Sequence, residues 1–381
     1  MNRFWQTTRS ALAMLASLGI MAGCEPWSDL EDYDREEVPV YWAETLTPPA
    51  IEQARELKIM TWNFKFGGAR IDFFFDYWGD RSVMTTEEVQ GNLDGLMRLI
   101  NEIKPDVLIA EEVDVNSKRS GYVDMLQYTL DHTDLNYGAF YEAWDTRYAP
   151  DQSVGRALMG NAIFSIYPIA KAERIRSADR TDQAIYESYF LLHRVIGRAE
   201  IEAGNHHVAA YDVHAEAYDE DGTKKKHVDQ FHQLMIDETL PVVLGGDFNN
   251  IPPTSLKREK FNDDSPDAVG TRYESPPYDL DAMQAFYDDF NPAITLARFG
   301  DTQESQRLHF SHTIIGPDHI ANDGLHGFWN RKIDYLWIKK DQSWKPGSTD
   351  TLQNRGRMGI TQEPMTLSDH CPLIGTWELG S

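Results

Sequence analysis

The sequence contains very little cysteine. Only Cys24 and Cys371 occur among its 381 residues, which excludes a small scaffold held together by many disulfides. A chain of this length can bury enough apolar surface to fold on its core alone. Its hydrophobic fraction of 41% is that of an ordinary globular protein.

Positive charge is also scarce. The chain has 36 Lys and Arg against 61 Asp and Glu, which gives a formal net charge of −25. Proteins that bind nucleic acid without sequence preference carry a basic surface, because their affinity comes from neutralising phosphates. The charge balance therefore argues against bulk nucleic-acid binding, although a local basic groove could exist within an acidic protein.

Apolar runs are short, and the most apolar one lies at the N-terminus. Arg3 and Arg9 precede an apolar run over residues 11–21, which is too short to span a bilayer. The run ends in Met21-Ala22-Gly23-Cys24, which resembles a bacterial lipoprotein cleavage site. We expect residues 1–23 to be a lipoprotein signal peptide, with lipidated Cys24 anchoring the protein in the bacterial cell envelope on the periplasmic or cell-surface side. The alternative is an ordinary secretory signal with an incidental cysteine.

The remaining chain divides into a short acidic segment and one long domain. Residues 24–55 are acidic and contain proline, which indicates a tether. Residues 56–381 are predicted to form one domain of class α+β, because strands follow one another at mixed spacings with few helices between them. Residues 252–279 lack periodicity and are predicted to be a surface excursion. The predicted helices cover 85–104 and 227–240; the predicted strands cover 57–63, 107–110, 162–165, 189–202, 206–214, 241–246, 333–338 and 373–379.

Polar side chains stand at the ends of these predicted strands. They are Asn63, Glu112, His214, Asp247, Asn249, Asp334, Asp369 and His370. Carboxylate and amide oxygens are suitable ligands for Mg²⁺ or Mn²⁺, and histidine can act as an acid or an electrostatic partner. This combination is what metal-assisted hydrolysis of a phosphoester requires.

Six sequence blocks carry a family resemblance. They are 61–63 (TWN), 105–113 (PDVLIAEEV), 160–165 (GNAIFS), 246–249 (GDFN), 331–335 (RKIDY) and 368–372 (SDHCP). In this order, over roughly residues 57–379, the chain resembles the endonuclease/exonuclease/phosphatase superfamily. The resemblance implies a four-layer α/β/β/α sandwich, with two packed mixed sheets flanked by helices, and a metal-dependent phosphoric ester hydrolase.

The resemblance also implies a metal site. Glu112 matches the principal metal carboxylate, Asn63 completes or supports that site, and Asp369 assists it. The implied cofactor is Mg²⁺ or Mn²⁺. Glu111 stands where the family usually has glutamine, which would place a second negative charge beside Glu112.

The same resemblance implies catalytic roles. Asp247 matches the residue that orients or activates the attacking water, and Asn249 the residue that hydrogen-bonds a phosphoryl oxygen. His370 matches the histidine that contacts the scissile phosphate, and Asp334 the carboxylate that orients its ring. His214 is a candidate second phosphate contact, although Asp212-Val213-His214-Ala215 departs from the family's Thr-His-Leu.

Each of these residues, taken singly, could instead be a cap, a turn residue or a structural histidine. Other features are open as well. The aromatic residues 73–78 could be a lid or an apolar platform, with core packing or an insertion favoured, and the histidines between 309 and 326 are interpreted as a polar loop near the cleft mouth rather than a zinc site. Arg331 and Lys332 are predicted to be well placed to meet a phosphate.

Together these features predict an exported, lipid-anchored phosphodiesterase or phosphatase. Its expected substrate is a phosphoester such as a phospholipid head group, an inositol phosphate or a nucleotide. Two alternatives are a secreted nuclease of the same family that acts on DNA or RNA, and a surface-binding lipoprotein that has lost turnover. The sequence gives no oligomeric state.

Overall fold

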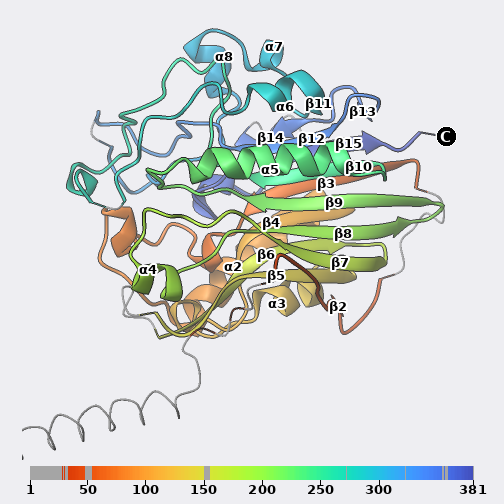
Figure 1. The fold of residues 1–381 in the computed structure, drawn as a ribbon, viewed down its shortest axis with the longest axis horizontal. Coiled ribbons are helices and arrows are strands. Elements are labelled where there is room, and N and C mark those ends of the chain that lie inside the picture. Colours follow the sequence, from red (N-terminus) through yellow and green to blue (C-terminus); the bar gives the residue numbers. More distant parts are fainter. Residues whose placement is uncertain are drawn as a thin grey trace, which may run out of the picture.

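Two mixed β-sheets pack face to face at the centre of the computed structural model (Figure 1). The structure describes residues 28, 30, 33–47, 54–149, 155–271, 273–321, 323–353, 356 and 359–380. The predicted signal peptide and Cys24 lie outside the described residues. Within them, no helix combines the length and the hydropathy that crossing a bilayer requires.

The first sheet has seven strands in the order β1-β7-β8-β9-β10-β12-β11. Most neighbours are antiparallel, whereas β9 and β10 are parallel. The strand bounds are β1 Arg35–Glu37, β7 Ile169–Arg176, β8 Val195–Ala203, β9 His206–His214, β10 Val242–Asp247, β11 Phe290–Pro292 and β12 Asp334–Lys339.

The second sheet has eight strands. Seven follow the order β13-β15-β3-β4-β6-β5-β2, β14 pairs with β15, and β3 and β4 are parallel. The bounds are β2 Val40–Trp42, β3 Glu56–Asn63, β4 Val107–Asp114, β5 Tyr137–Ala149, β6 Gly155–Ser165, β13 Ser343–Trp344, β14 Asp350–Thr351 and β15 Leu373–Glu378.

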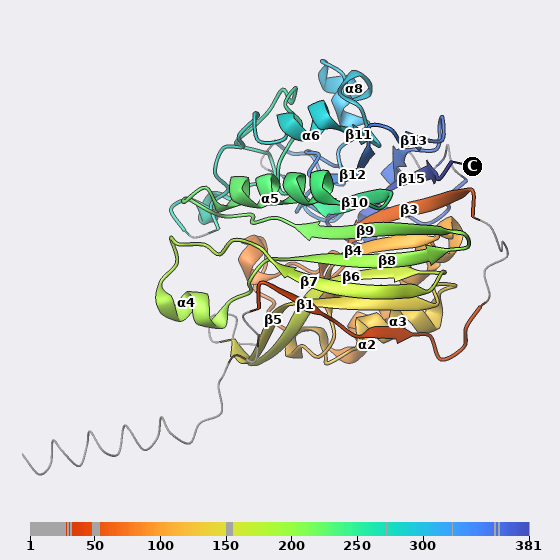
Figure 2. The same ribbon diagram turned by 45° about the vertical axis from the view of Figure 1, so that its right-hand side comes forward.

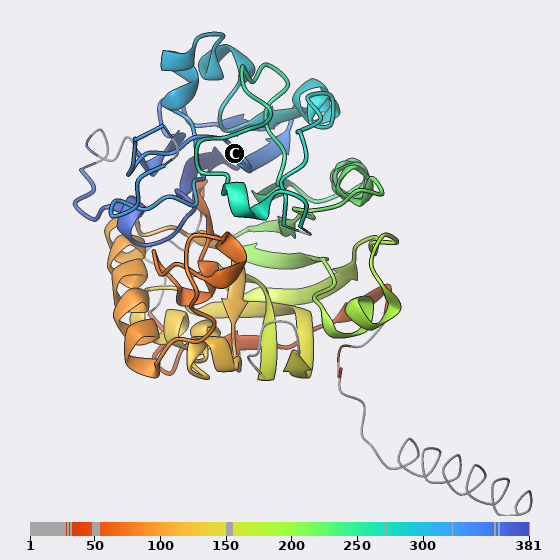
Figure 3. The ribbon, with the colours of Figure 1, turned by 90° about the vertical axis from the view of Figure 1, so that its left-hand side faces the viewer.

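Helices cover the outer face of each sheet, as the end-on view shows with α2 in orange on one side and α5 in green on the other (Figure 3). Three main apolar clusters fill the spaces between the four layers, one between the sheets and one under each helical layer. This arrangement confirms the predicted α/β/β/α sandwich. The helix bounds are α2 Thr86–Ile103, α3 Met125–His132, α4 Ile185–Phe190, α5 Thr223–Asp237, α6 Gln284–Asp289, α7 Leu296–Phe299 and α8 Gln303–Arg307.

The helix α2 shows how local sequence sets an element. The Thr85 side chain accepts a hydrogen bond from the Glu88 backbone N–H, and the Glu88 side chain accepts one from the Thr85 backbone N–H. This capping box fixes the first turn. The apolar residues of α2, spaced three and four apart, are buried against the eight-stranded sheet.

Part of the segment predicted as a tether is folded onto the sandwich (Figure 2). β1 pairs with β7 at the edge of one sheet, and β2 pairs with β5 at the edge of the other. Arg174 on β7 also forms an ion pair with Glu36 at 3.0 Å. Acidic composition indicated a solvated linker, but backbone pairing with two open sheet edges gives these residues ordered positions.

Candidate functional site

The predicted site residues lie at one end of the sandwich, where several strands end together. Asn63 ends β3 and pairs in register with Glu111 on the parallel strand β4. His214 ends β9, Asp247 ends β10, and the two pair in register. Asp334 begins the antiparallel neighbour β12 directly opposite Asp247. The topology therefore gathers residues that are far apart in the sequence.

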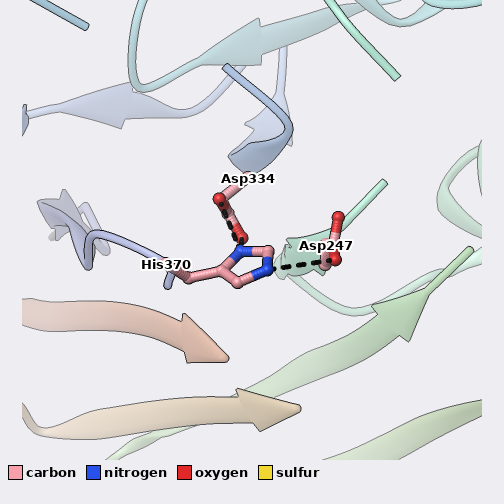
Figure 4. Close-up of side chains that lie close together, drawn as sticks. All are labelled: Asp247, Asp334 and His370. Atoms are coloured by element: carbon pink, nitrogen blue, oxygen red, sulfur yellow. Dashed lines mark hydrogen bonds and ion pairs between the residues drawn. The ribbon is translucent and has the colours of Figure 1, made fainter. Parts of the chain in front are cut away.

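Asp247, Asp334 and His370 form a buried group (Figure 4). The Nδ1 atom of His370 lies 2.9 Å and 3.1 Å from the two carboxylate oxygens of Asp334. Its Nε2 atom points the other way and lies 3.7 Å from Oδ2 of Asp247. The predicted orienting role of Asp334 is consistent with this geometry, because its carboxylate fixes the ring so that Nε2 faces Asp247.

The electrostatics of this group favour a protonated imidazole. Burial alone would lower the pKa of His370, but the Asp334 and Asp247 carboxylates outweigh it and raise the pKa to about 10. Burial raises the pKa of Asp247 to about 7, with the charge on His370 opposing the rise. An acid and a carboxylate with a pKa near neutral therefore stand side by side.

The loop after β10 holds Asn249 against Asp247. The backbone of Asn249 is left-handed, with φ at 47°, and its N–H donates to Oδ1 of Asp247 at 2.8 Å. Its side-chain amide donates to the carbonyl of Ala215 at 3.0 Å and to Oδ2 of Asp247 at 3.3 Å. The loop is thus an Asx-type turn that also fixes the Asp247 carboxylate.

His214 completes this side of the site. Its Nε2 atom lies 3.4 Å from Oδ2 of Asp247 and 4.0 Å from Oε1 of Glu112. Burial first, and then the positive charge of Arg194, lowers the pKa of His214 well below its usual range. His214 is therefore neutral, in contrast to His370.

The Glu112 side chain is partly exposed because β4 is irregular at this point. The register between β4 and β6 shifts between Ala110 and Val113, and Glu112 has a positive φ of 55°. Such a bulge re-aims a side chain, and the Glu112 side chain is 24% exposed. The Asn63 side-chain amide donates to Oε1 of Glu112 at 3.1 Å.

These residues fit a divalent cation. The Asn63 side-chain oxygen accepts from the backbone N–H of Lys65 at 2.9 Å while its amide N–H supports Glu112, and its role as a metal ligand stays a prediction. Mg²⁺ needs only one or two protein carboxylates when water and substrate oxygens fill its other positions. The Asp247, Asp334 and His370 ligand atoms also lie close enough together to hold a metal, although a metal at His370 would have to displace the imidazole proton.

Asp369 lies in an ion pair. Its Oδ2 atom lies 3.3 Å from Nζ of Lys65, and the same ammonium lies 3.2 Å from Oδ2 of Asp76. Burial would raise the pKa of Asp369, but the charges of Lys65, His370 and other neighbours hold it well below its usual range. The metal-assisting role of Asp369 stays a prediction, and the ion pair gives this residue a second role as the anchor of Lys65.

Glu111 does not line the cleft. It is fully buried, and the Thr61 hydroxyl donates to its Oε1 at 3.1 Å. Burial and the nearby Asp212 raise the pKa of Glu111 well above its usual range, which favours its neutral form. The register of β4 turns Glu111 inward together with Ile109, away from the partly exposed side chain of Glu112.

The predicted phosphate contacts from Arg331 and Lys332 were wrong. Arg331 is buried in an ion pair with Asp263. Lys332 is buried and donates to the carbonyl of Asp334, and burial lowers its pKa to about 7. Both side chains are paired with groups inside the protein. No sequence pattern indicated these pairs.

Two residues near the site were missed. Lys65 lies beside Asp369, and Arg194 is close enough to affect the pKa of both His214 and Asp247. The ring of His312, one of the histidines between 309 and 326, packs against His370 with 4.6 Å between ring centres. The position of Lys65 two residues after Asn63 was the only available signal.

Comparisons with known proteins agree with this fold. The family model described as "Endonuclease/Exonuclease/phosphatase family" matches residues 60–370. The endonuclease/exonuclease/phosphatase from Beutenbergia cavernae is 15% identical, with 86% of this chain and 72% of that chain covered and a TM-score of 0.53. The endonuclease/exonuclease/phosphatase from Bacteroides vulgatus is 13% identical, with 85% and 99% covered and a TM-score of 0.50. No curated protein matches the sequence. Because the family model spans most of the chain and its motif residues converge at one end of the sandwich, the chain belongs to the endonuclease/exonuclease/phosphatase family.

Proposed function

We propose that this protein is an exported, lipid-anchored phosphodiesterase or phosphatase that uses Mg²⁺ or Mn²⁺. Members of the family are typically metal-dependent phosphoester hydrolases. The proposal rests mainly on one arrangement of side chains. Asp334 holds a protonated His370, and the Nε2 atom of His370 lies 3.7 Å from the Asp247 carboxylate.

In the proposed reaction the chain supplies a base, an acid and a hydrogen-bond donor. Asp247 accepts a proton from the attacking water, and its pKa of about 7 suits this task near neutral pH. The Nε2–H of His370 stabilises the charge that develops on the phosphoryl oxygens or the leaving oxygen. Neutral His214 lies beside Asp247 and orients the phosphate, and the Asn249 amide moves from Asp247 to a phosphoryl oxygen when substrate binds.

Glu112, supported by Asn63, is the proposed ligand of the divalent cation. When bound, the cation neutralises phosphate charge and so lowers the barrier to attack. A cation is needed because the cleft carries carboxylates from β4, β10 and β12, which would otherwise repel the substrate.

The proposed anchor would hold the domain close to the bilayer. Ser28 already pairs with Thr146 on β5, and its hydroxyl donates to the Asp145 carbonyl at 3.3 Å. Ser28 follows Cys24 by four positions in the chain, a span of at most about 14 Å. Cys24→Ser should move the protein from the membrane fraction to the soluble fraction and leave its turnover unchanged; retention in the membrane fraction would argue against lipidation of Cys24.

The activity is tested with bis-p-nitrophenyl phosphate and p-nitrophenyl phosphate. We expect nitrophenol release with Mg²⁺ or Mn²⁺, loss with a chelator and loss in Asp247→Asn. Asp229→Asn, which removes an exposed carboxylate paired with Lys225 on α5, is the matched control and should retain activity. Faster cleavage of plasmid DNA or RNA would favour the nuclease alternative, and a folded protein without turnover would favour the binding lipoprotein.

A further inference from the structure

A cavity of about 720 Å³ has Asp76, an ion-pair partner of Lys65, in its wall. Its wall comes mainly from two segments, residues 75–77 within the aromatic stretch and residues 257–277 within the predicted surface excursion. Tyr218, four residues after His214, contributes a third wall. The excursion therefore forms one side of a pocket that is open to solvent.

One buried lysine connects the cavity to the site. Asp76 lines the cavity, and its carboxylate lies 3.2 Å from Nζ of Lys65. The same ammonium lies 3.3 Å from Asp369, the neighbour of His370 in the chain. One buried ammonium therefore links a residue of the cavity wall to a residue next to His370.

The wall is fixed by buried partners. The Trp78 indole N–H donates to the Asp263 carbonyl at 2.8 Å, and the Ser265 hydroxyl donates to the Tyr77 carbonyl at 3.1 Å. Asp263 is fully buried and pairs with Arg331, three residues before Asp334. Because these contacts join both segments to each other and to the start of β12, the cavity is formed before a ligand arrives.

Aromatic side chains dominate the apolar part of the lining. The rings of Tyr77 and Tyr218 each lie 5.8 Å from the ring of Tyr273, at 58° and 89° to it. The volume lies within the range of small-molecule sites, and aromatic rings favour planar ligands that can stack. The aromatic lining residues are Phe75, Tyr77, Tyr218, Phe261 and Tyr273.

The charge of the lining selects against long anions. Two lysines, Lys257 and Lys260, face the five carboxylates Asp76, Glu259, Asp264, Glu274 and Asp323. A nucleic-acid strand would need a basic groove to follow its backbone, which this lining does not provide. An uncharged planar group attached to a single phosphoester is compatible with both the rings and the charge.

We propose that this cavity binds the aromatic part of the substrate, and that the substrate class is a small phosphoester with a planar aromatic group of one or two rings. The inference rests on the proposed phosphoesterase function. It gives the aromatic stretch 73–78 and the excursion 252–279 one shared role, which is to hold the organic group while the strand ends hold the phosphate.

The test uses three phosphonates that share one head group: methyl-, phenyl- and naphthylphosphonate. Binding to the full protein with Mn²⁺ is measured by calorimetry, and hydrolysis of bis-p-nitrophenyl phosphate is measured in parallel. We expect naphthylphosphonate to bind at least about tenfold more tightly than methylphosphonate, because one stacked ring system contributes that much.

Variants at Tyr273 locate the effect. Tyr273 is partly exposed, so its replacement should leave the fold intact. Tyr273→Ala should reduce the preference in affinity for naphthylphosphonate over methylphosphonate to about threefold or less, without changing methylphosphonate binding. Tyr273→Phe should keep this preference because the ring is retained. Tyr122→Ala removes an exposed tyrosine outside the cavity lining and should behave as wild type.

The outcomes separate this inference from the proposed function. Turnover of bis-p-nitrophenyl phosphate with equal affinity for all three phosphonates would overturn the aromatic site and leave the phosphoesterase standing. Tyr273-dependent preference for the naphthyl group without any turnover would support the cavity and overturn the enzyme. An unchanged ratio in Tyr273→Ala would also overturn the aromatic site.

Discussion

Glu112 and Asp114 lie two residues apart on β4, and their surroundings differ completely. Asp114 is fully buried and accepts two hydrogen bonds of 2.9 Å from Arg119 and one of 2.8 Å from Ser120. Glu112 is partly exposed to the cleft, and among the described residues no lysine or arginine lies within ion-pair distance of it. A buried carboxylate with its own cation is a structural element, whereas a carboxylate without one is available to an external cation.

The same contrast separates the group of charged residues around Arg119 from the group around His370. Around Arg119 the charges balance and each carboxylate oxygen has a donor. Around His370, one imidazolium faces two carboxylates, and burial raises the pKa of Asp247 to about 7. The site therefore holds negative charge that the protein itself does not neutralise. This charge lowers the stability of the fold, and it keeps the Asp247 carboxylate available for proton transfer. Four predictions test this comparison.

The largest effect is expected from Asp247→Asn. Loss of the proton acceptor should reduce kcat/KM by a factor on the order of 10³, while the free energy of unfolding at neutral pH should be unchanged or higher, because a strained buried charge is removed. Steady-state kinetics and urea unfolding measure both. A clear loss of stability would mean that Asp247 is structurally paired, like Asp114.

The reverse pattern is expected from Arg119→Met. Leaving Asp114 buried without its guanidinium should lower the free energy of unfolding by about 3–5 kcal/mol. Turnover per folded molecule should stay within about twofold of wild type, since Arg119 touches no site residue that we assign to catalysis. Urea unfolding and active-site-normalised rates provide the measurement, and a large fall in kcat of the folded protein would contradict the separation of the two clusters.

A smaller effect is expected from Glu112→Gln. Removing the charge of the proposed ligand should weaken Mn²⁺ binding at least about tenfold, measured by calorimetry without substrate. Asp369→Asn is the matched control, because the Asp369 carboxylate is already paired with Lys65. If Asp369→Asn weakens Mn²⁺ binding as much as Glu112→Gln, then Asp369 is a metal ligand and Lys65 does not neutralise it.

The smallest effect is expected from Glu238→Gln on the outer face of the seven-stranded sheet. Glu238 accepts from Arg198 at 2.8 Å and from Tyr211 at 2.9 Å. Burial opposes this arrangement, but these partners lower the pKa of Glu238 to about 2. The wild type should be more stable by about 1 kcal/mol at pH 7.

The pH dependence of that difference follows from the sign of the shift. A lowered folded-state pKa stabilises the protein above the unfolded-state pKa of about 4.3. The advantage over Glu238→Gln should therefore shrink as the pH falls from about 4 toward 2, measured by urea unfolding across this range. A difference in the free energy of unfolding that does not change with pH would show that Arg198 does not stabilise the charged form of Glu238.

Much of the fold could be predicted because its signals are local. The capping box at Thr85 and Glu88, and the apolar spacing of α2, lie within a few residues of each other. The strands β5 and β7 were not predicted, and the segment predicted as a strand from 189 begins instead in α4. β5 carries aromatic and polar residues in no simple alternation, since part of it faces a satellite core under loops.

The sequence named candidate site residues but not the side chains that pair with them in the structure. The predicted strands placed Asn63, Glu112, Asp247 and His370 at strand ends, whereas Glu112 lies within β4, which continues to Asp114. The sequence did not indicate that Lys65 would pair with Asp369, or that Arg331 would be held by Asp263, 68 residues earlier. These pairs depend on loops whose courses leave no periodic signal.

The sequence by itself determined which chemical groups this protein carries and that they stand at strand ends, because strand periodicity and short motifs are properties of neighbouring residues. The tertiary structure decided what each group does. Burial and non-local charges keep Asp334 beside His370 and, among the described residues, leave Glu112 without a lysine or arginine within ion-pair distance. Packing of residues 73–78 against 257–277 likewise created the cavity, because charge state and shape depend on neighbours that only folding brings together.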